Sequence, residues 1–290
     1  MMRVTSRMMT NNLLKNLSDN MDRLDKFNRQ LSTGKKFNMP SQDPTGVARS
    51  MRLEETIGDN KQYNDNIDQA LTWMQTTEGA LKNADKILQR TRELTVYGAN
   101  DSLSDIDRKA IVDEVKELRK NLASVANTKY NDKYIFSGQK TLIKPYPTAG
   151  SAYQGDNNKI VREIDQDVKM NVNVNGDFFK GILDEMQSLV NDLNTGNTDD
   201  ISNVRLGNID KHLDKTIRLR SELGAKQNRL ELTQNRLEDS KIKFKKLLSE
   251  NEDVDIAKTI MDLKMSENVY RASLASGARI IQPSLVQFLK

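Results

Sequence analysis

The longest helical pattern of the chain lies in "IDKHLDKTIRLRSELGAKQNRLELTQNRLEDSKIKF", Ile209–Phe244. Apolar or small residues recur at every seventh position in it: Ile209, Thr216, Leu223, Leu230, Leu237 and Phe244. A second row contains Leu206, Leu213 and Leu248, and its other places are polar: Arg220, Gln227, Gln234 and Lys241. A seven-residue repeat keeps one stripe of side chains on the same face of a helix. The pattern therefore predicts one long helix over Asp200–Ser249 that packs along other helices.

Heptad patterns also occur at both ends of the chain. In the helix expected over 12–33, the seam residues are Leu14, Leu17, Met21, Leu24, Asn28 and Leu31. In the last helix, which begins near Val254, one row holds Leu263, Tyr270, Gly277 and Ser284, and the other holds Leu274, Ile281 and Phe288. Ile281, Leu285 and Phe288 share one face of that helix. We expect the two terminal helices to pair, and outer apolar residues such as Met8, Leu13, Ile280 and Leu289 to be covered by other copies of the chain.

The segment "STGKKFNMPSQDPTG", Ser32–Gly46, interrupts the helical pattern. Its glycines and prolines do not fit inside one helix, so an irregular connector is expected. It also carries apolar and charged residues, whereas a flexible linker is rich in Gly and Ser. We therefore predict an ordered joint, formed by Gly34, Lys35, Asn38, Asp43, Pro44 and Gly46.

The middle of the chain is helical except for one short region. Long helical patterns cover Val47–Gly98 and a segment that begins at Ser104, an N-cap with Asp107 three residues on, and ends near Thr128. "VKMNVNV", Val168–Val174, alternates apolar and polar residues as a half-buried strand does, and "KIVRE" before it supplies a partner strand. This stretch is the only β candidate, and a short helix over Phe179–Asn194 follows it.

These patterns predict a mainly α fold, an elongated antiparallel helical rod or coiled coil with paired terminal helices and a small β-containing excursion. We expect three parts: a terminal-helix assembly domain of residues 1–40 with 255–290, a helical rod domain of residues 41–137 with 181–254, and a β-containing segment of residues 138–180. The assembly residues are expected to be Met8, Leu13, Leu14, Leu17, Met21, Leu24, Leu31, Leu263, Tyr270, Leu274, Ile281, Leu285 and Phe288.

Composition excludes several classes of protein. Charged residues make up 30% of the chain and hydrophobic residues 36%, which predicts a narrow core. Residues 1–40 hold eight Lys/Arg and three Asp/Glu, a balance of +5, so the remaining 250 residues sum to −1 within the total of +4. So small a surplus argues against nucleic acid as the main partner. No stretch approaches a membrane span, and no apolar segment of a cleaved leader is visible.

The sequence contains no pattern of a catalytic site. Cysteine is absent, and the single histidine, His212, is expected at a surface or seam position of the long helix. "STGKK" lacks the first glycine and the strand–helix context of a phosphate loop. Trp73 lies among apolar residues and is expected in the core. We therefore expect a protein that is not an enzyme and that has no metal or cofactor.

Three segments resemble the bacterial flagellin family. "QLSTGKKFNMPSQDPTGVARS" (Gln30–Ser50) is similar to the family's N-terminal signature, and "YQGD" (Tyr153–Asp156) with the later "VNVNGDFF" is similar to its mid-chain β segment. "SENVYRASLASGARIIQPSLVQFL" is similar to its terminal helix. The Asp-Pro of the connector and the "IIQPSLVQFL" end are most similar to the members at the hook–filament junction, since flagellins of the filament tend to have Ala or Gly in place of Pro44.

The resemblance implies a structural subunit of the bacterial flagellum: an adapter at the hook–filament junction on which the flagellin filament assembles, needed for motility and exported through the type III apparatus. It implies self-association in the axial structure, contacts with a neighbouring hook-associated protein and with flagellin, and a cytosolic export chaperone on the C-terminal region. Neither nucleic acid nor a membrane is an expected partner. Three alternatives stay open: a short filament flagellin, a cytoplasmic regulatory coiled-coil protein, and a membrane-active helix bundle, which the 30% charge opposes.

Overall fold

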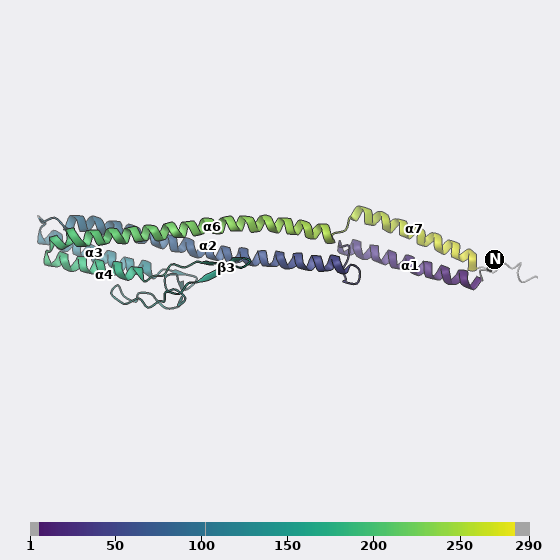
Figure 1. Ribbon diagram of the computed structural model, residues 1–290, viewed down its shortest axis with the longest axis horizontal. Coiled ribbons are helices and arrows are strands. Elements are labelled where there is room, and N and C mark those ends of the chain that lie inside the picture. Colours follow the sequence, from purple (N-terminus) through teal and green to yellow (C-terminus); the bar gives the residue numbers. More distant parts are fainter. Residues whose placement is uncertain (1–5, 102, 282–290) are drawn as a thin grey trace, which may run out of the picture. The chain divides into compact units, whose positions relative to one another are not determined.

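The computed structural model describes residues 6–101 and 103–281. This part of the chain is mainly α-helical, as the sequence predicts (Figure 1). The α-helices are α1 Ser6–Thr33, α2 Pro44–Gly98, α3 Asp105–Ala126, α4 Phe178–Thr195, the short α5 Thr198–Asp200, α6 Leu206–Glu252 and α7 Ile256–Ile281, and the π-helix η1 Ile201–Arg205 lies between α5 and α6. The chain divides into two compact units: a terminal unit, residues 1–58 with 240–290, and a central unit, residues 59–239. No helix in the described ranges is long and apolar enough to cross a membrane.

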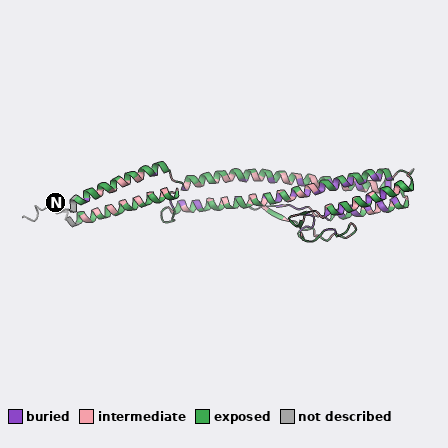
Figure 2. Ribbon diagram, turned by 180° about the vertical axis from the view of Figure 1, so that it is seen from behind, coloured by how far each residue is buried: buried purple, intermediate pink, exposed green. Residues whose placement is uncertain are grey.

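The core of the central unit lies where α2, α3, α4 and α6 run together. Figure 2 shows buried residues in purple along these helices. The heptad row of α6 is confirmed there, because Ile209, Leu223, Leu230 and Leu237 are at most 4% exposed and Thr216 is fully buried. Burying each of the large apolar side chains is worth about 1.5–3 kcal/mol. The seven-residue repeat thus holds α6 against its neighbours.

Two polar residues in the second heptad row of α6, Arg220 and Gln234, bind acidic residues of α2. Arg220 forms ion pairs with Glu78 at 2.8 Å and with Asp85 at 3.2 Å. Gln234 Nε2 donates a hydrogen bond to Asp68 at 2.7 Å. Positions later in α6 therefore meet positions earlier in α2, so the two helices run antiparallel. These polar pairs fix the register of the two helices, because a shifted pairing would leave half-buried charges unpaired.

The start of α3 follows the predicted N-cap. Ser104 Oγ accepts a hydrogen bond from the backbone N–H of Asp107 at 3.2 Å, which satisfies one of the free donors of the first turn. Asp105 and Asp107 lie in that first turn, where negative charge suits the positive end of the helix dipole. The helix ends at Ala126, close to the expected end near Thr128.

The β elements are two small hairpins in the central unit. Strand β3 (Val161–Asp165) pairs antiparallel with β4 (Val168–Asn171), which confirms the predicted pair. A second hairpin, β1 (Lys129–Tyr130) with β2 (Lys133–Tyr134), contradicts the prediction of a single β region. Its turn residues, Asn131 and Asp132, both have positive φ, 47° and 60°, as the tightest hairpin turns require. A two-residue strand is too short to show an alternating pattern.

Two tyrosines hold the loops around these hairpins. The Tyr146 hydroxyl donates to the carbonyl of Gly176 at 2.8 Å, and the Tyr153 hydroxyl donates to the carbonyl of Phe136 at 2.7 Å. Burial raises the pKa of Tyr146 well above its usual value and raises the pKa of Tyr153 to about 12. Both phenols therefore stay protonated donors at neutral pH.

The sequence predicts a surface or seam position for the single histidine, and the structure places it at the seam. His212 is half-buried on α6 and faces Gly181 of α4, where an added Cβ would lie 3.1 Å from the imidazole. Burial lowers the pKa of His212, so the ring is neutral at physiological pH. It packs as an uncharged side chain between two helices.

Candidate assembly surface and connector joint

Two connectors of the terminal unit hydrogen-bond to each other through their backbones. One joins α1 to α2 over residues 34–43, and the other joins α6 to α7. The N–H of Lys36 donates to the carbonyl of Glu252 at 2.6 Å, and the N–H of Val254 donates to the carbonyl of Gly34 at 2.9 Å. These bonds form a single antiparallel β-bridge between segments more than 200 residues apart.

Lysine side chains strengthen the contact between the connectors. Lys35 Nζ lies 2.9 Å from Glu252 Oε1, and Glu252 is only 8% exposed. The hydrogen bond to Glu252 raises the pKa of Lys35, so the buried carboxylate keeps a charged partner over the physiological pH range. Lys36 Nζ donates to the carbonyl of Glu250 at 2.7 Å, near the C-terminal end of α6, where a cation is favoured.

The start of α2 is fixed by an Asp-Pro-x-Gly turn. Asp43 Oδ1 accepts hydrogen bonds from Gly46 N and Thr45 Oγ1, both at 2.9 Å, and these bonds lower the pKa of Asp43. An added Cβ on Gly46 would meet the Asp43 carboxylate and lie 2.7 Å from the ring of Phe37. Pro44 and Gly46 belong to the first turn of α2, so the expectation that they lie in the irregular connector is wrong. Proline suits a first helical position, since an N–H there has no helical acceptor.

The remaining connector residues also make defined contacts. Gly34 ends α1 with φ +71°, a left-handed conformation that favours glycine. Asn38 Nδ2 donates to Thr33 Oγ1 at 3.2 Å, and the N–H of Asn38 bonds to Gln42 Oε1 at 2.9 Å. Phe37 is buried, whereas Met39 is exposed. The connector has the contacts of an ordered joint, and its role in assembly stays a prediction.

Helices α1 and α7 lie side by side (Figure 1). Their contact stripe contains one predicted row of each helix, Leu17, Leu24 and Leu31 of α1 and Leu263, Tyr270 and Gly277 of α7, but not the second predicted row of α1. The α1 residues that are half-buried along this stripe are Leu13, Leu17, Asn20, Leu24, Phe27 and Leu31. The corresponding α7 residues are Thr259, Leu263, Ser266, Tyr270, Ser273 and Gly277. Both lists step by four and three, as packed helices require.

The predicted seam residues Leu14 and Met21 lie outside this stripe, with 57% and 56% of their surface exposed. Leu13, which was expected to be uncovered, packs instead against Gly277, where an added Cβ would lie 2.6 Å from its side chain. Asn20 Nδ2 lies 3.4 Å from Ser273 Oγ. Leu13 and Leu14 are neighbours in the sequence, so either could continue the row, and Gly277 leaves the space that Leu13 fills.

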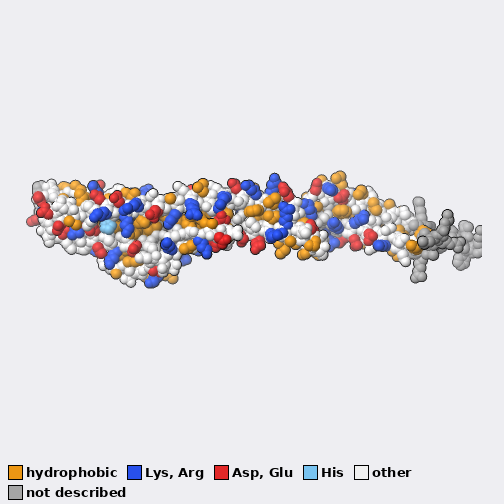
Figure 3. Space-filling view, viewed as in Figure 1, with side chains coloured by type: hydrophobic (Ala, Val, Ile, Leu, Met, Phe, Trp, Pro, Cys, Tyr) orange, Lys and Arg blue, Asp and Glu red, His pale blue; other side chains and the backbone are white. Residues whose placement is uncertain are grey.

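Large apolar side chains of the terminal helices point to solvent. On α7 these are Ile256, Ile260, Met261, Met265, Val269 and Leu274, and on α1 they are Met8, Met9, Leu14 and Met21. Figure 3 shows hydrophobic side chains (orange) between charged ones on the visible face of this unit. The seam of α7 consists mostly of Ser, Thr, Gly and Tyr, so the helix exposes most of its large apolar residues. Exposed apolar patches of this kind mark interaction sites.

The predicted assembly residues thus fall into three groups. Leu13, Leu17, Leu24, Leu31, Leu263 and Tyr270 lie in the α1–α7 contact. Met8, Leu14, Met21 and Leu274 face solvent. Ile281 is the last residue of α7, and Leu285 and Phe288 lie outside the described residues. Sequence reasoning missed the exposed residues Met9, Ile256, Ile260, Met261, Met265 and Val269, although their spacing of four within α7 was a usable signal.

The described residues hold no group of acidic or histidine side chains that is arranged to bind a metal ion. The features that stand out in the terminal unit are an exposed apolar surface and a joint between two connectors.

The comparisons with known proteins agree with this description. The model of the bacterial flagellin N-terminal helical region matches residues 4–141, and that of the C-terminal helical region matches residues 206–289. Flagellar hook-associated protein 3 of Salmonella typhimurium is 29% identical over 165 residues, 57% of this chain and 52% of that protein, so the chain spans about half the length of this relative. Flagellin of Bacillus subtilis is 29% identical over 97% of each chain.

The fold is shared with a solved structure. The crystal structure of flagellar hook-associated protein 3 from Legionella pneumophila superposes with a TM-score of 0.64 at 20% identity, over 69% of this chain and 98% of that one. The two flagellin regions together match most of the chain and contain the helices of both its ends. The chain belongs to the bacterial flagellin family.

Proposed function

We propose that this protein is a structural, non-enzymatic subunit of the bacterial flagellum, an adapter at the hook–filament junction on which the flagellin filament assembles. The observation that carries the proposal is the apolar outer surface of the α1–α7 pair. The similarity to hook-associated protein 3 supports the junction in particular.

The energetics of the terminal unit favour assembly. Covering one large apolar side chain is worth about 1.5–3 kcal/mol, so covering the exposed methionines and isoleucines of α7 supplies several kcal/mol per subunit. Association must offset the translational and rotational freedom that each subunit loses. Burial of this face by several neighbouring chains offsets that loss of freedom. In a lone α1–α7 pair the face stays exposed to solvent.

We infer that three parts of the chain have different roles. Residues 1–40 with 255–290 form the assembly domain, residues 41–137 with 181–254 form the rod domain, and residues 138–180 form a small β-containing segment on the rod. Partners are other copies of the chain, a neighbouring hook-associated protein, flagellin, and an export chaperone that holds the C-terminal region. The protein reaches the flagellum by export, without nucleic acid or membrane as a partner.

A second candidate function is that of a short filament flagellin. The similarity to Bacillus subtilis flagellin over 97% of both chains favours it. The two functions predict different locations, because an adapter occupies one short zone whereas a filament subunit repeats along the whole filament.

A deletion strain separates the two. Loss of the adapter leaves flagellin synthesis intact, so cells stop swimming, lose filaments and release unassembled flagellin into the medium. Immunogold labelling of the complemented strain then marks only the filament base. Label along the whole filament supports the second candidate, and normal swimming of the deletion strain contradicts both.

A further inference from the structure

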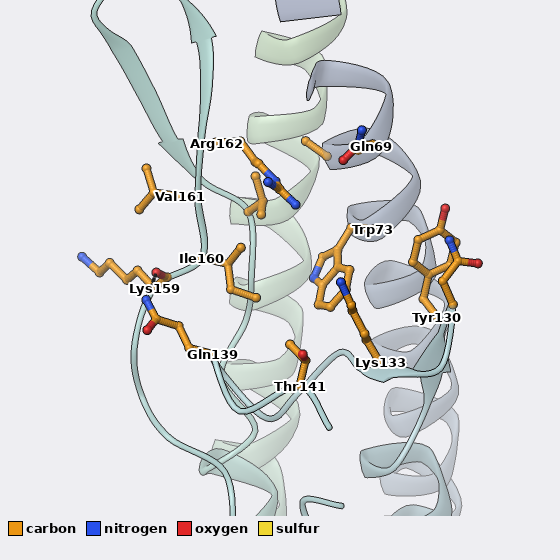
Figure 4. Close-up of a pocket in the computed structure, with 13 residues that line it drawn as sticks. Gln69, Trp73, Tyr130, Lys133, Gln139, Thr141, Lys159, Ile160, Val161 and Arg162 are labelled. Atoms are coloured by element: carbon orange, nitrogen blue, oxygen red, sulfur yellow. Dashed lines mark hydrogen bonds between the residues drawn. The ribbon is translucent and has the colours of Figure 1, made fainter. Parts of the chain in front are cut away.

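A cavity of about 580 Å³ opens in the central unit between α2 and the hairpin loops (Figure 4). This volume lies within the usual range for small-molecule sites. Its lining residues are Gln69, Ala70, Trp73, Tyr130, Asn131, Lys133, Gln139, Thr141, Lys159, Ile160, Val161, Arg162 and Val172. The cavity lies in a different unit from the terminal helices, and the proposed function makes no use of it.

One side of the cavity is aromatic and apolar. Trp73 of α2 and Tyr130 of β1 meet edge to face, with ring centroids 6.2 Å apart and planes at 85°. Ile160 and Val172 add aliphatic surface. In Figure 4 the Trp73 ring faces the segment that carries Ile160 and Arg162. Such a wall packs against a flat apolar surface of a ligand.

The rim of the cavity is cationic. Lys133, Lys159 and Arg162 line it, and no Asp or Glu does. None of the three forms an ion pair within the described part of the chain, although other arginines of the central unit do. Three unpaired cations around one opening favour an anionic ligand, and a guanidinium in particular can bind both oxygens of a carboxylate.

Hydrogen-bonding groups complete the lining. The indole N–H of Trp73 is buried and has no protein acceptor among the described residues. Gln69 and Asn131 also line the cavity, and a side-chain amide can donate and accept at once. A hydroxyl group also donates and accepts, so it matches an amide better than a bare anion does.

We propose that this cavity binds an acidic sugar of the uronic-acid type, free or as the end of a glycan. A pyranose ring has a flat C–H face for Trp73, hydroxyl groups for Gln69 and Asn131, and a carboxylate for Arg162 and the lysines. A neutral sugar would leave the cations unmatched, and an inorganic anion would leave the aromatic wall uncovered.

Trp73 is the only tryptophan of the chain, so its fluorescence reports on this cavity alone. The full-length protein is titrated at constant ionic strength with D-glucuronate, D-glucose and acetate. We expect a saturable change of emission with glucuronate, and less than a tenth of that affinity with glucose or acetate. Polygalacturonate in place of glucuronate distinguishes a polymer from the free sugar, and tighter binding of the polymer assigns the site to a glycan end.

Two variants test the cationic rim. Arg162→Gln removes a lining charge from an exposed strand residue, and we expect at least tenfold weaker glucuronate binding with an unchanged thermal midpoint. Lys86→Gln removes an exposed charge of α2 that does not line the cavity, and it should bind as the wild type does.

Three results would overturn the proposal. The first is the absence of a saturable fluorescence change with both glucuronate and polygalacturonate. The second is equal affinity for glucose and glucuronate. The third is an equal loss of glucuronate binding in Arg162→Gln and Lys86→Gln. A fluorescence change on dilution of the protein without ligand would also overturn it, because a second copy of the chain would then occupy the cavity.

Discussion

At the scale of single residues, two glycines of α2 are expected to respond to alanine in opposite directions. Gly46 is buried, and a Cβ there meets the Asp43 carboxylate and the Phe37 ring. Gly58 has no neighbour within 4 Å of its added Cβ. We expect Gly46→Ala to destabilise the terminal unit by about 1–3 kcal/mol. Gly58→Ala should stabilise α2 by about 0.5–1 kcal/mol, because alanine restricts the unfolded chain.

Urea denaturation of both variants, followed by circular dichroism, measures the two effects against the wild type. Gly58→Ala serves as the control for the general effect of alanine in a helix. If Gly46→Ala is as stable as the wild type, the turn at the start of α2 is looser than its contacts indicate.

Tyr153 is expected to make the central unit sensitive to alkali. Its pKa rises from about 10 in the unfolded chain to about 12 in the folded one. The phenol therefore contributes stability that is fully present below pH 10 and is lost as the pH rises to 12. We expect wild-type stability to fall by about 1–3 kcal/mol more than that of Tyr153→Phe across this window.

Denaturation series at pH 8 and pH 11.5 measure this difference. Tyr153→Phe should be less stable than the wild type at pH 8, because the carbonyl of Phe136 loses one of its two donors and keeps only the N–H of Gly176. Parallel losses in the two proteins would assign the alkaline transition to other groups.

At the level of helices and strands, Arg220 is expected to contribute more to the free energy of unfolding than an exposed arginine does. It joins Glu78 and Asp85 of α2, and its own side chain is 29% exposed. We expect Arg220→Ala to cost about 1–3 kcal/mol, because half-buried carboxylates lose their partner. Arg92→Ala breaks a pair with Asp210 in which both side chains are nearly half exposed, and should cost less than 1 kcal/mol, about the usual limit for surface pairs.

Thermal unfolding of the two alanine variants compares these pairs, and Arg220→Lys adds a test of geometry. A lysine is a single point charge and cannot bind two carboxylates as a guanidinium does, so most of the loss should persist. Equal stability of Arg220→Ala and Arg92→Ala would show that the register of α2 and α6 depends on apolar contacts alone.

The elements differ in how well the sequence predicts them. Long periodic segments such as α6 carry enough repeats to define one buried face, and the Ser104 cap marks the start of α3. One row of the α1 seam, Leu17, Leu24 and Leu31, was predicted correctly, whereas the other row is displaced by one residue, so that Leu13 and not Leu14 packs against Gly277. The β1–β2 hairpin is too short to show a pattern.

The candidate sites also differ in how well the sequence predicts them, because a site is visible only where its residues form a local pattern. The connector over Ser32–Gly46 was visible because its residues lie in one short segment, whereas its bonds to Glu252 and Val254 join segments more than 200 residues apart and were not predicted. The exposed apolar face of α7 was largely missed, since a heptad reading assigns apolar residues to the inside of a pair. The cavity beside Trp73 combines residues from positions 69 to 172, so no local pattern predicts it.

At the scale of the whole molecule, outer apolar residues should matter for assembly and not for the stability of the free chain. Met261 and Met265 of α7 are 65% and 64% exposed. We expect the double variant Met261→Ser, Met265→Ser to unfold at the wild-type temperature, because neither side chain is buried in the free chain. In cells it should fail to restore filaments to a deletion strain.

Leu263→Ala provides the contrast, since Leu263 lies in the α1–α7 contact and is half-buried. It should lower the thermal midpoint of the terminal unit. Normal swimming with the Met261→Ser, Met265→Ser protein would remove α7's outer face from the assembly surface, and a large drop in its thermal midpoint would place those residues in the chain's own core.

The pairing of α1 with α7 also sets the order in which the chain can fold. Asn20 and its contact Ser273 are separated by 253 residues. At about 5–20 residues per second, a ribosome adds that length in roughly 10–50 s, during which α1 has no partner. All residues of the central unit, 59–239, are synthesised before α7, so this unit can fold first. The terminal unit can fold only after α7 has been synthesised. Helix α1 is therefore synthesised before the central unit but completes its contacts after it.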